Sequence, residues 1–373
     1  MRQISLRCAI TCAAVFVVAN AVRGDDDKGG ANVYLQHNLV SDVLGVAAGQ
    51  DEKLVNAWGI DHSPTGPWWV NSNGMGVSVV YDGNGNPFPA GNRLVVTIPA
   101  PGGGTSTPTG IVFNGSMDFQ LAPTMPAFFL FATEDGTISG WNSQVDPKNA
   151  VIKVTTPNAV YKGLTIGQTG GHSYIYAANF TGGTVDVFDT NFSPVTLPGS
   201  PFQDSNIPAG FAPFNVQNID GSIFVTYAKV NPVTHDDESG PGNGYVDRFT
   251  AGGVLMTRFE HGDFLNSPWG VTTTPGGFGK LSQKLLVGNF GSGQIAAFNM
   301  ESGNFQSMMN GPDGKPITID GLWGLKFGNG GTAGASDVLY FAAGIDDEAH
   351  GLFGTLVPAA KSEDGNNEQG HKK

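Results

Sequence analysis

Trp58-Gly59-Ile60 is the first of six copies of a short motif, in which glycine, or asparagine in one copy, precedes Ile, Leu or Val. Successive copies are separated by 51, 53, 52, 55 and 54 residues. A period of about 53 residues predicts a propeller or a solenoid rather than two ordinary domains. The later copies are Thr109-Gly110-Ile111, Lys162-Gly163-Leu164, Phe214-Asn215-Val216, Trp269-Gly270-Val271 and Trp323-Gly324-Leu325.

The fourth copy has Asn215 where the other copies have glycine. Asn is the non-glycine residue that best tolerates a positive φ angle. The motif therefore predicts a left-handed turn at all six positions.

The second half of each repeat distinguishes a propeller from a solenoid. It contains β-branched and aromatic runs that are separated by Gly, Asn and Asp, as in residues 68–82, 128–142, 174–189 and 285–299. Such runs are typical of short antiparallel strands, whereas helical solenoids need long stretches with a period of 3.6 residues. The sequence predicts an all-β, six-bladed β-propeller with four-stranded blades.

The last repeat has no outer strand after residue 357, and residues 33–40 precede the first repeat. We expect residues 33–40 to complete the sixth blade and close the ring, which removes an exposed edge. The predicted domain is 32–358, preceded by a flexible lead at 22–31 and followed by a polar, disordered tail at 359–373.

Residues 1–21 have the pattern of a signal peptide: two arginines, an apolar stretch at 8–18, and Ala19-Asn20-Ala21 as a cleavage site. An uncleaved anchor is the alternative, although the apolar stretch is short for a membrane span. Cys8 and Cys12 both lie in this segment, so the mature chain would be cysteine-free. We expect a secreted protein, extracellular or periplasmic, with no membrane span after cleavage.

The chain is acidic, with a formal net charge of −13, and removal of Arg2 and Arg7 with the signal would take it to −15. No basic cluster interrupts this acidity. The composition therefore excludes nucleic acid as the expected partner and is typical of a soluble extracellular protein, which we expect to be a monomer.

Several stretches resemble an uncharacterised family of secreted bacterial proteins, over about residues 38–358. Many members of that family carry a PEP-type C-terminal sorting anchor. This chain instead ends in the polar stretch 368–373, which favours a soluble product. The stretches that carry the resemblance are 54–67, 131–142, 235–246, 321–331 and His350-Gly351-Leu352-Phe353-Gly354.

The repeats resemble, more loosely, NHL-repeat and gluconolactonase-type propellers. That resemblance implies a divalent metal held by carboxylate and amide ligands, some of them directly before the motif glycine. The corresponding residues here are neither carboxylates nor amides, so the lactonase site is not expected. These residues are Trp58, Thr109, Lys162, Phe214, Trp269 and Trp323.

We expect the six motifs and the turns between second and third strands to meet at one end of the channel, called here the motif mouth. The aromatic motif residues have two interpretations: a stacking platform for a ligand, or packing between blades. Lys162 either meets an anionic ligand or pairs with Glu134. The candidate ligand-binding residues are Trp58, Lys162, Phe214, Trp269, Trp323, Glu134, Asn179 and Asn289.

The fourth repeat contains an insertion at residues 230–243, which is rich in carboxylates and glycine. Folded over the motif mouth, it would contribute oxygen ligands suited to Ca²⁺, or to a transition metal if a histidine joined them. The alternative is a solvated acidic loop. The candidate metal ligands are His235, Asp236, Asp237, Asp346, Asp347 and His350.

No nucleophile elbow or zinc motif is present in the sequence, a catalytic triad depends on geometry that a sequence does not show, and no catalytic residue is assigned. The sequence favours a binding or scaffold protein with a glycan, small-molecule or protein ligand at the motif mouth. The alternative is a metal-assisted hydrolase or lyase that uses the same mouth.

Overall fold

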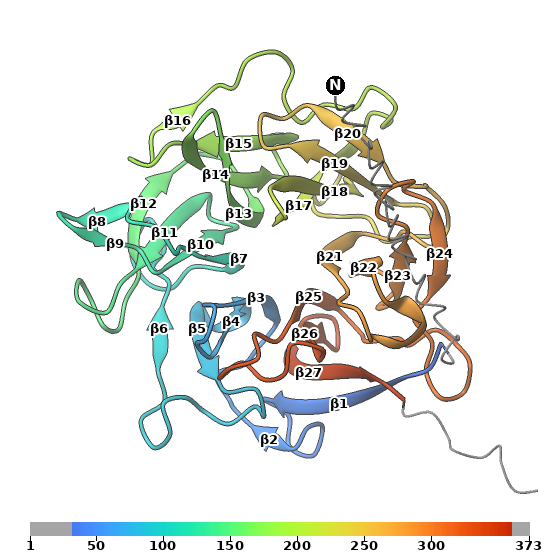
Figure 1. The fold of residues 1–373 in the computed structure, drawn as a ribbon. Coiled ribbons are helices and arrows are strands. Elements are labelled where there is room, and N and C mark those ends of the chain that lie inside the picture. Colours follow the sequence, from blue (N-terminus) through green and yellow to red (C-terminus); the bar gives the residue numbers. More distant parts are fainter. Residues whose placement is uncertain (1–31, 360–373) are drawn as a thin grey trace, which may run out of the picture.

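The computed structural model describes residues 32–359, so the expected signal peptide and most of the predicted tail lie outside the described residues. Six sheets surround a central channel, with the first strand of each repeat innermost (Figure 1). Their strands pair antiparallel, except for one short parallel pair at the outer edge of the sixth sheet. The predicted six-bladed β-propeller is therefore confirmed.

The first three blades run in chain order from the innermost strand outward. Blade one consists of β3 (Ala57–His62), β4 (Trp68–Ser72), β5 (Val77–Tyr81) and β6 (Val95–Thr97). Blade two consists of β7 (Pro108–Phe113), β10 (Phe129–Thr133), β11 (Thr137–Trp141) and β12 (Val151–Thr155). Blade three consists of β13 (Tyr161–Thr169), β14 (His172–Asn179), β15 (Thr184–Phe188) and β16 (Pro194–Val195).

Blades four and five follow the same order, and blade six ends on strands from both ends of the described chain. Blade four consists of β17 (Phe211–Ile219), β18 (Ser222–Lys229), β19 (Gly244–Thr250) and β20 (Leu255–Arg258). Blade five consists of β21 (Pro268–Thr273), β22 (Leu285–Asn289), β23 (Ile295–Phe298) and β24 (Phe305–Met308). Blade six consists of β25 (Leu322–Phe327), β26 (Leu339–Ile345), β27 (His350–Pro358), β1 (Tyr34–Ser41) and β2 (Gly49–Gln50).

Four small elements lie in the connections between strands. They are η1 (Asn73–Met75), β8 (Gln120–Ala122), β9 (Met125–Pro126) and η2 (Gly279–Leu281).

The ring closes as the sequence predicts. Strand β1 pairs antiparallel with β27, from Tyr34 opposite Pro358 to Ser41 opposite Leu352. The buried Tyr34 hydroxyl also donates a hydrogen bond to the Phe278 carbonyl at 2.9 Å, in blade five. The N-terminal strand thus completes blade six and ties it to its neighbour.

Apolar side chains fill the space between neighbouring blades. Six buried clusters each join two adjacent blades, and a seventh occupies the channel axis. Between blades one and two, for example, the rings of Trp69 and Trp141 lie 4.7 Å apart. This burial of apolar surface between the sheets stabilises the ring.

The repeated motif is a β-bulge in the innermost strand, so the predicted left-handed turn is wrong. In all six blades the innermost strand has one more residue than its partner at the motif. None of the five motif glycines, nor Asn215, has a positive φ angle. A bulge redirects a side chain without a left-handed residue.

Close approach between innermost strands explains the glycines instead. A Cβ on Gly110 would lie 2.5 Å from the Leu164 nitrogen, and one on Gly270 would lie 2.5 Å from the Trp323 oxygen. Both neighbours are backbone atoms, which have no freedom to move aside. The channel therefore narrows to a cavity of about 20 Å³, enough for one water molecule.

Asn215 provides a different solution in blade four. Its side-chain amide donates a hydrogen bond to the Trp269 carbonyl at 2.8 Å, in blade five. Its amide oxygen accepts a hydrogen bond from the Val216 N–H at 2.8 Å. The side chain thus occupies the channel and bridges two blades.

We expect Gly110→Ala to destabilise the whole ring by about 1–3 kcal/mol, because the added methyl group meets backbone. Gly276→Ala is the matched control, since Gly276 has open space around it and no positive φ. Thermal unfolding followed by circular dichroism measures both. Equal melting temperatures for the two variants would contradict the close-approach explanation.

Candidate functional site

The four aromatic motif residues pack against one another at the motif mouth, forming an aromatic plug. The rings of Trp58 and Trp323 are stacked with centroids 3.7 Å apart, and Phe290 stacks on the other side of Trp323 at 3.9 Å. All four motif rings are at least 95% buried, so neighbouring rings and not solvent cover them. The plug consists of Trp58, Phe214, Trp269 and Trp323, supported by Phe180 and Phe290.

This burial fits the packing interpretation rather than an open stacking platform. The rings fill the channel axis, however, and not the space between neighbouring blades as that interpretation expected. The Trp269 indole N–H donates a hydrogen bond at 2.8 Å to the Lys162 carbonyl, which belongs to blade three. Ligand contact by the four rings stays a prediction.

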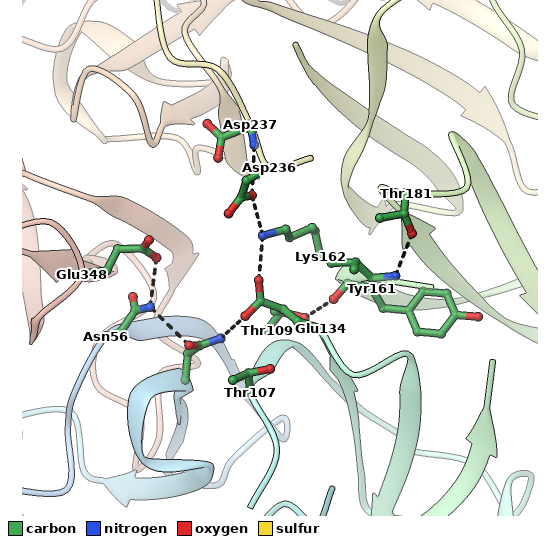
Figure 2. Close-up of polar contacts among 12 residues, drawn as sticks. Asn56, Thr107, Thr109, Glu134, Tyr161, Lys162, Thr181, Asp236, Asp237 and Glu348 are labelled. Carbon is green, nitrogen blue, oxygen red and sulfur yellow. Dashed lines mark hydrogen bonds and ion pairs between the residues drawn. The ribbon is translucent and has the colours of Figure 1, made fainter. Parts of the chain in front are cut away.

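Lys162 lies above the plug, with a side chain that is only 4% exposed. Its ammonium group donates hydrogen bonds to Glu134 Oε1 at 2.7 Å and to Asp236 Oδ1 at 2.9 Å (Figure 2). It also lies 5.2 Å from the centre of a Trp58 ring, within range of a cation–π interaction. The expected pairing of Lys162 with Glu134 is present.

The two carboxylates fix the charge of Lys162. Burial alone would lower the pKa of its ammonium group, but attraction to Glu134 and Asp236 outweighs burial and raises that pKa. Lys162 is therefore a permanent cation at neutral pH.

Asp236 reaches Lys162 from the insertion at residues 230–243, which joins β18 to β19. The insertion is anchored at its base, where Lys229 pairs with Glu238 at 2.7 Å and Val230 bridges Asp237. Asp236 itself is 56% exposed. One partly exposed ion pair thus connects the insertion of blade four to the neighbouring blade three.

Hydrogen bonds continue from Glu134 through two asparagines to blade six. The Asn73 amide donates to Glu134 Oε2 at 3.0 Å, and the Asn56 amide donates to Glu348 Oε1 at 2.9 Å (Figure 2). The asparagines are themselves joined by a bond of 3.3 Å. These hydrogen bonds link six side chains in series around the mouth. We call this group the polar ring, and it consists of Glu348, Asn56, Asn73, Glu134, Lys162 and Asp236.

Two carboxyl groups at this mouth are less acidic than usual. Burial raises the pKa of Glu348 and that of Asp237, which follows Asp236 in the insertion. Glu348 also has a φ angle of +64°, in the left-handed region that disfavours side chains. The turn holds Glu348 in this conformation while its carboxylate accepts the hydrogen bond from Asn56.

The structure places the other candidate ligand-binding residues in their own turns. Asn179 is buried and donates a hydrogen bond to Asp186 at 2.9 Å. Asn289 is fully buried and accepts a hydrogen bond from the Asn266 N–H at 2.8 Å. Both side chains use hydrogen bonds to shape local backbone, and their role in ligand binding stays a prediction.

The candidate metal ligands do not gather in one place. Asp236 is held by Lys162, whereas His350 pairs with Asp42 at 2.7 Å. Asp346 and Asp347 are exposed, and the neighbouring Glu348 points to the mouth instead. Within residues 32–359, no three His, Cys, Asp or Glu side chains form a group that would hold a metal ion. Metal binding, like His235 as a ligand, stays a prediction.

Sequence reasoning missed Asn56 and Glu348. Asp346, Asp347 and Glu348 are consecutive, and all three have positive φ angles between 50° and 64°. Which of three adjacent acids faces the mouth depends on this unusual turn, for which the sequence carries no signal. Asn56 precedes the first motif by two residues, a spacing that the other repeats do not share.

Fold and site together define this protein as a six-bladed β-propeller with a plugged channel and a polar ring over one mouth. It belongs to a family that includes uncharacterised protein L690 of Acanthamoeba polyphaga mimivirus, which is 32% identical and aligns over 86% of this chain and 84% of its own length. Uncharacterised protein R648 of the same virus is 31% identical, over 85% of this chain and 78% of its own length.

No family model matches the chain. Among solved structures, a glucose dehydrogenase superposes with a TM-score of 0.50 at 10% identity, covering 87% of this chain and 99% of that chain. This likeness shows the shared fold alone. The predicted relationship to secreted bacterial proteins stays a prediction.

We expect Glu348→Gln to stabilise the protein more at pH 7 than at pH 4. A carboxyl group with a raised pKa holds its proton more tightly in the folded state, so its contribution to stability falls as pH rises from the unfolded value through the raised value. Glutamine keeps a side-chain oxygen that accepts the hydrogen bond from Asn56. Because glutamine does not ionise, it removes the loss of stability that ionisation of Glu348 causes. The gain should therefore grow as pH rises from 4 to 7.

Melting temperatures of both proteins across this pH range measure the difference. The exposed Glu301→Gln is the control and should show no such gain. A Glu348→Gln gain that is equal at both pH values would contradict the burial of this carboxyl group.

Proposed function

We propose that this protein binds glycans outside the cytoplasm and that the polar ring at the motif mouth is its contact surface. The observation that carries the proposal is a surplus of hydrogen-bond acceptors. Asn56 Oδ1 and Asp237 Oδ2 are buried there without a well-formed hydrogen bond. Buried polar atoms need partners, and sugar hydroxyl groups are donors.

The charges at this mouth favour glycans that carry free amino groups. Glu134, Asp236, Asp237 and Glu348 are four carboxyl groups around one ammonium group, that of Lys162. A ligand ammonium would compete with Lys162 for these oxygens and form charge-assisted hydrogen bonds. The raised pKa values of Glu348 and Asp237 reduce this attraction at acidic pH, because protonation removes their charge.

The insertion provides access to the polar ring. Its contact with the neighbouring blade three is the Asp236–Lys162 ion pair, in which the Asp236 side chain is 56% exposed and the Lys162 side chain only 4% exposed. Lys162 keeps its pairing with Glu134 when Asp236 moves away, so the buried ammonium group is not left without a partner. A bound ligand would replace the Asp236–Lys162 pair with several hydrogen bonds.

The expected signal peptide at residues 1–21 supports a location outside the cytoplasm, as does the cysteine-free chain after it. The region that the structure describes contains no helix long and apolar enough to cross a membrane. Lys162 has no free base form near neutral pH, which favours binding over proton abstraction at this mouth.

A protein partner is the second candidate. The insertion exposes Val233, whose side chain is 83% accessible, at its tip beside the motif mouth. An exposed apolar side chain on a loop suits contact with another protein. A protein ligand would bury Val233, whereas a glycan bound in the polar ring would leave it exposed.

Titration calorimetry with a glucosamine hexamer and an N-acetylglucosamine hexamer tests the proposal. The two oligosaccharides differ in their amino groups, so we expect the charged hexamer to bind at least fivefold more tightly. Asp236→Asn should weaken its binding by roughly five- to tenfold, which corresponds to about 1 kcal/mol. Asp337→Asn, an exposed acid outside the polar ring, should bind like the unmodified protein.

Equal affinity for both hexamers would contradict the charge argument. Absence of binding by both hexamers would contradict glycan binding by the polar ring. Binding that Asp236→Asn leaves unchanged would place the ligand elsewhere on the protein.

A further inference from the structure

The channel opens at its other end into a cup of about 390 Å³, called here the opposite cup. The innermost strands all run from the motif mouth toward this end, so the residues that follow the motifs line it. Five blades contribute to the cup. Its polar lining includes Asp61, His62, Thr165, Gln217 and Lys326.

Asp61 is a buried anchor whose hydrogen-bonding capacity is already used. Its carboxylate accepts hydrogen bonds from the Phe113 N–H at 2.6 Å and the His62 N–H at 2.7 Å. It also pairs with the Lys326 ammonium at 2.8 Å. The Asp61 side chain is 7% exposed, so it joins three blades and offers little surface to a ligand.

Lys326 is therefore the charge that a ligand in the cup meets. Its side chain is 30% exposed, about four times as much as that of Asp61. The bond to Asp61 fixes the ammonium group in place, and an ammonium has three protons to donate. Burial and the nearby Lys326 lower the pKa of His62, so His62 adds no positive charge at neutral pH.

One further donor lies in the same cup. The Gln217 side chain makes no hydrogen bond within residues 32–359, and it lines both the cup and the narrow channel below. The Thr165 hydroxyl accepts a hydrogen bond from the Asn218 N–H at 3.1 Å, but Thr165 is buried and offers little surface to a ligand. An amide donor and an ammonium donor thus share one concavity.

Apart from Asn218, whose amide donates a hydrogen bond to the Ile166 carbonyl at 2.7 Å, the rest of the lining is apolar. Val112, Phe113, Ile166 and Pro64 face the cup, and all are at least partly exposed. A cup of this volume is in the range of small-molecule sites, which combine apolar walls with a few placed polar groups.

We propose that the opposite cup binds a small molecule that carries a carboxylate. The carboxylate would contact Lys326 and Gln217, and the body of the molecule would lie against Phe113 and Ile166. This preference is opposite to that of the polar ring, where acceptors are in excess. The two ends of one channel would thus select ligands of opposite charge, on a chain whose formal net charge is −13.

Galacturonate and galactose are matched probes, since they differ by a carboxylate in place of a hydroxymethyl group. Saturation-transfer NMR and titration calorimetry should show galacturonate binding at least tenfold more tightly than galactose. Lys326→Met should remove this preference, whereas Lys326→Arg should retain it. Lys315→Met, an exposed lysine that does not line the cup, is the control and should change nothing.

Gln217→Met leaves the Asp61–Lys326 pair intact and should weaken galacturonate binding roughly threefold to fivefold. It keeps the proposal testable if Lys326→Met fails to fold, which circular dichroism reports. Asp236→Asn should leave galacturonate binding unchanged. The proposal for the opposite cup is therefore tested separately from the proposal for the polar ring. Equal affinity for the two sugars, no binding of either, or an equal loss in Lys315→Met would overturn the proposal.

Discussion

The close approach of six innermost strands around a narrow axis is the constraint on which this propeller depends. At Gly110 and Gly270 the neighbouring backbone occupies the space where a Cβ would stand. Any larger residue would push two blades apart, and the widened ring would no longer bury the apolar clusters between its sheets. Asn215 is tolerated because its side chain donates a hydrogen bond to the Trp269 carbonyl of the neighbouring blade.

The same bulges that bring the strands together also decide what lies at the mouth. In five of the six blades the residue before the motif glycine or Asn215 lies at the axis, where four aromatic rings meet and Lys162 lies over Trp58. The polar ring then links residues from five blades through hydrogen bonds. Residues that stabilise the assembly of the blades and residues of the proposed glycan site are therefore partly the same, so we expect substitutions here to change stability as well as any binding.

Much of the fold follows from the spacing of the motif, because a strict period with short β-prone runs permits few architectures. The missing outer strand after residue 357 likewise predicts closure by β1. A bulge and a left-handed turn both favour glycine, so sequence alone could not separate them. The pairing of Lys162 with Glu134 was predictable, whereas the role of Glu348 depends on turn geometry. The opposite cup was missed because its equivalent positions, two residues after the motif glycine or Asn215, carry no shared residue type: they are Asp61, Val112, Thr165, Gln217 and Lys326.

Closure by β1 has a consequence for how the protein folds during synthesis. Tyr34 pairs with Pro358, so the first described strand finds its partner only when the last one has been made. Until then β1 is an unpaired edge, and the five complete blades are an open arc with an uncovered side. Contacts between residues so distant in sequence form slowly. A chain that leaves the ribosome or crosses a membrane from its N-terminus therefore stays without its closing strand pair until β27 has been made.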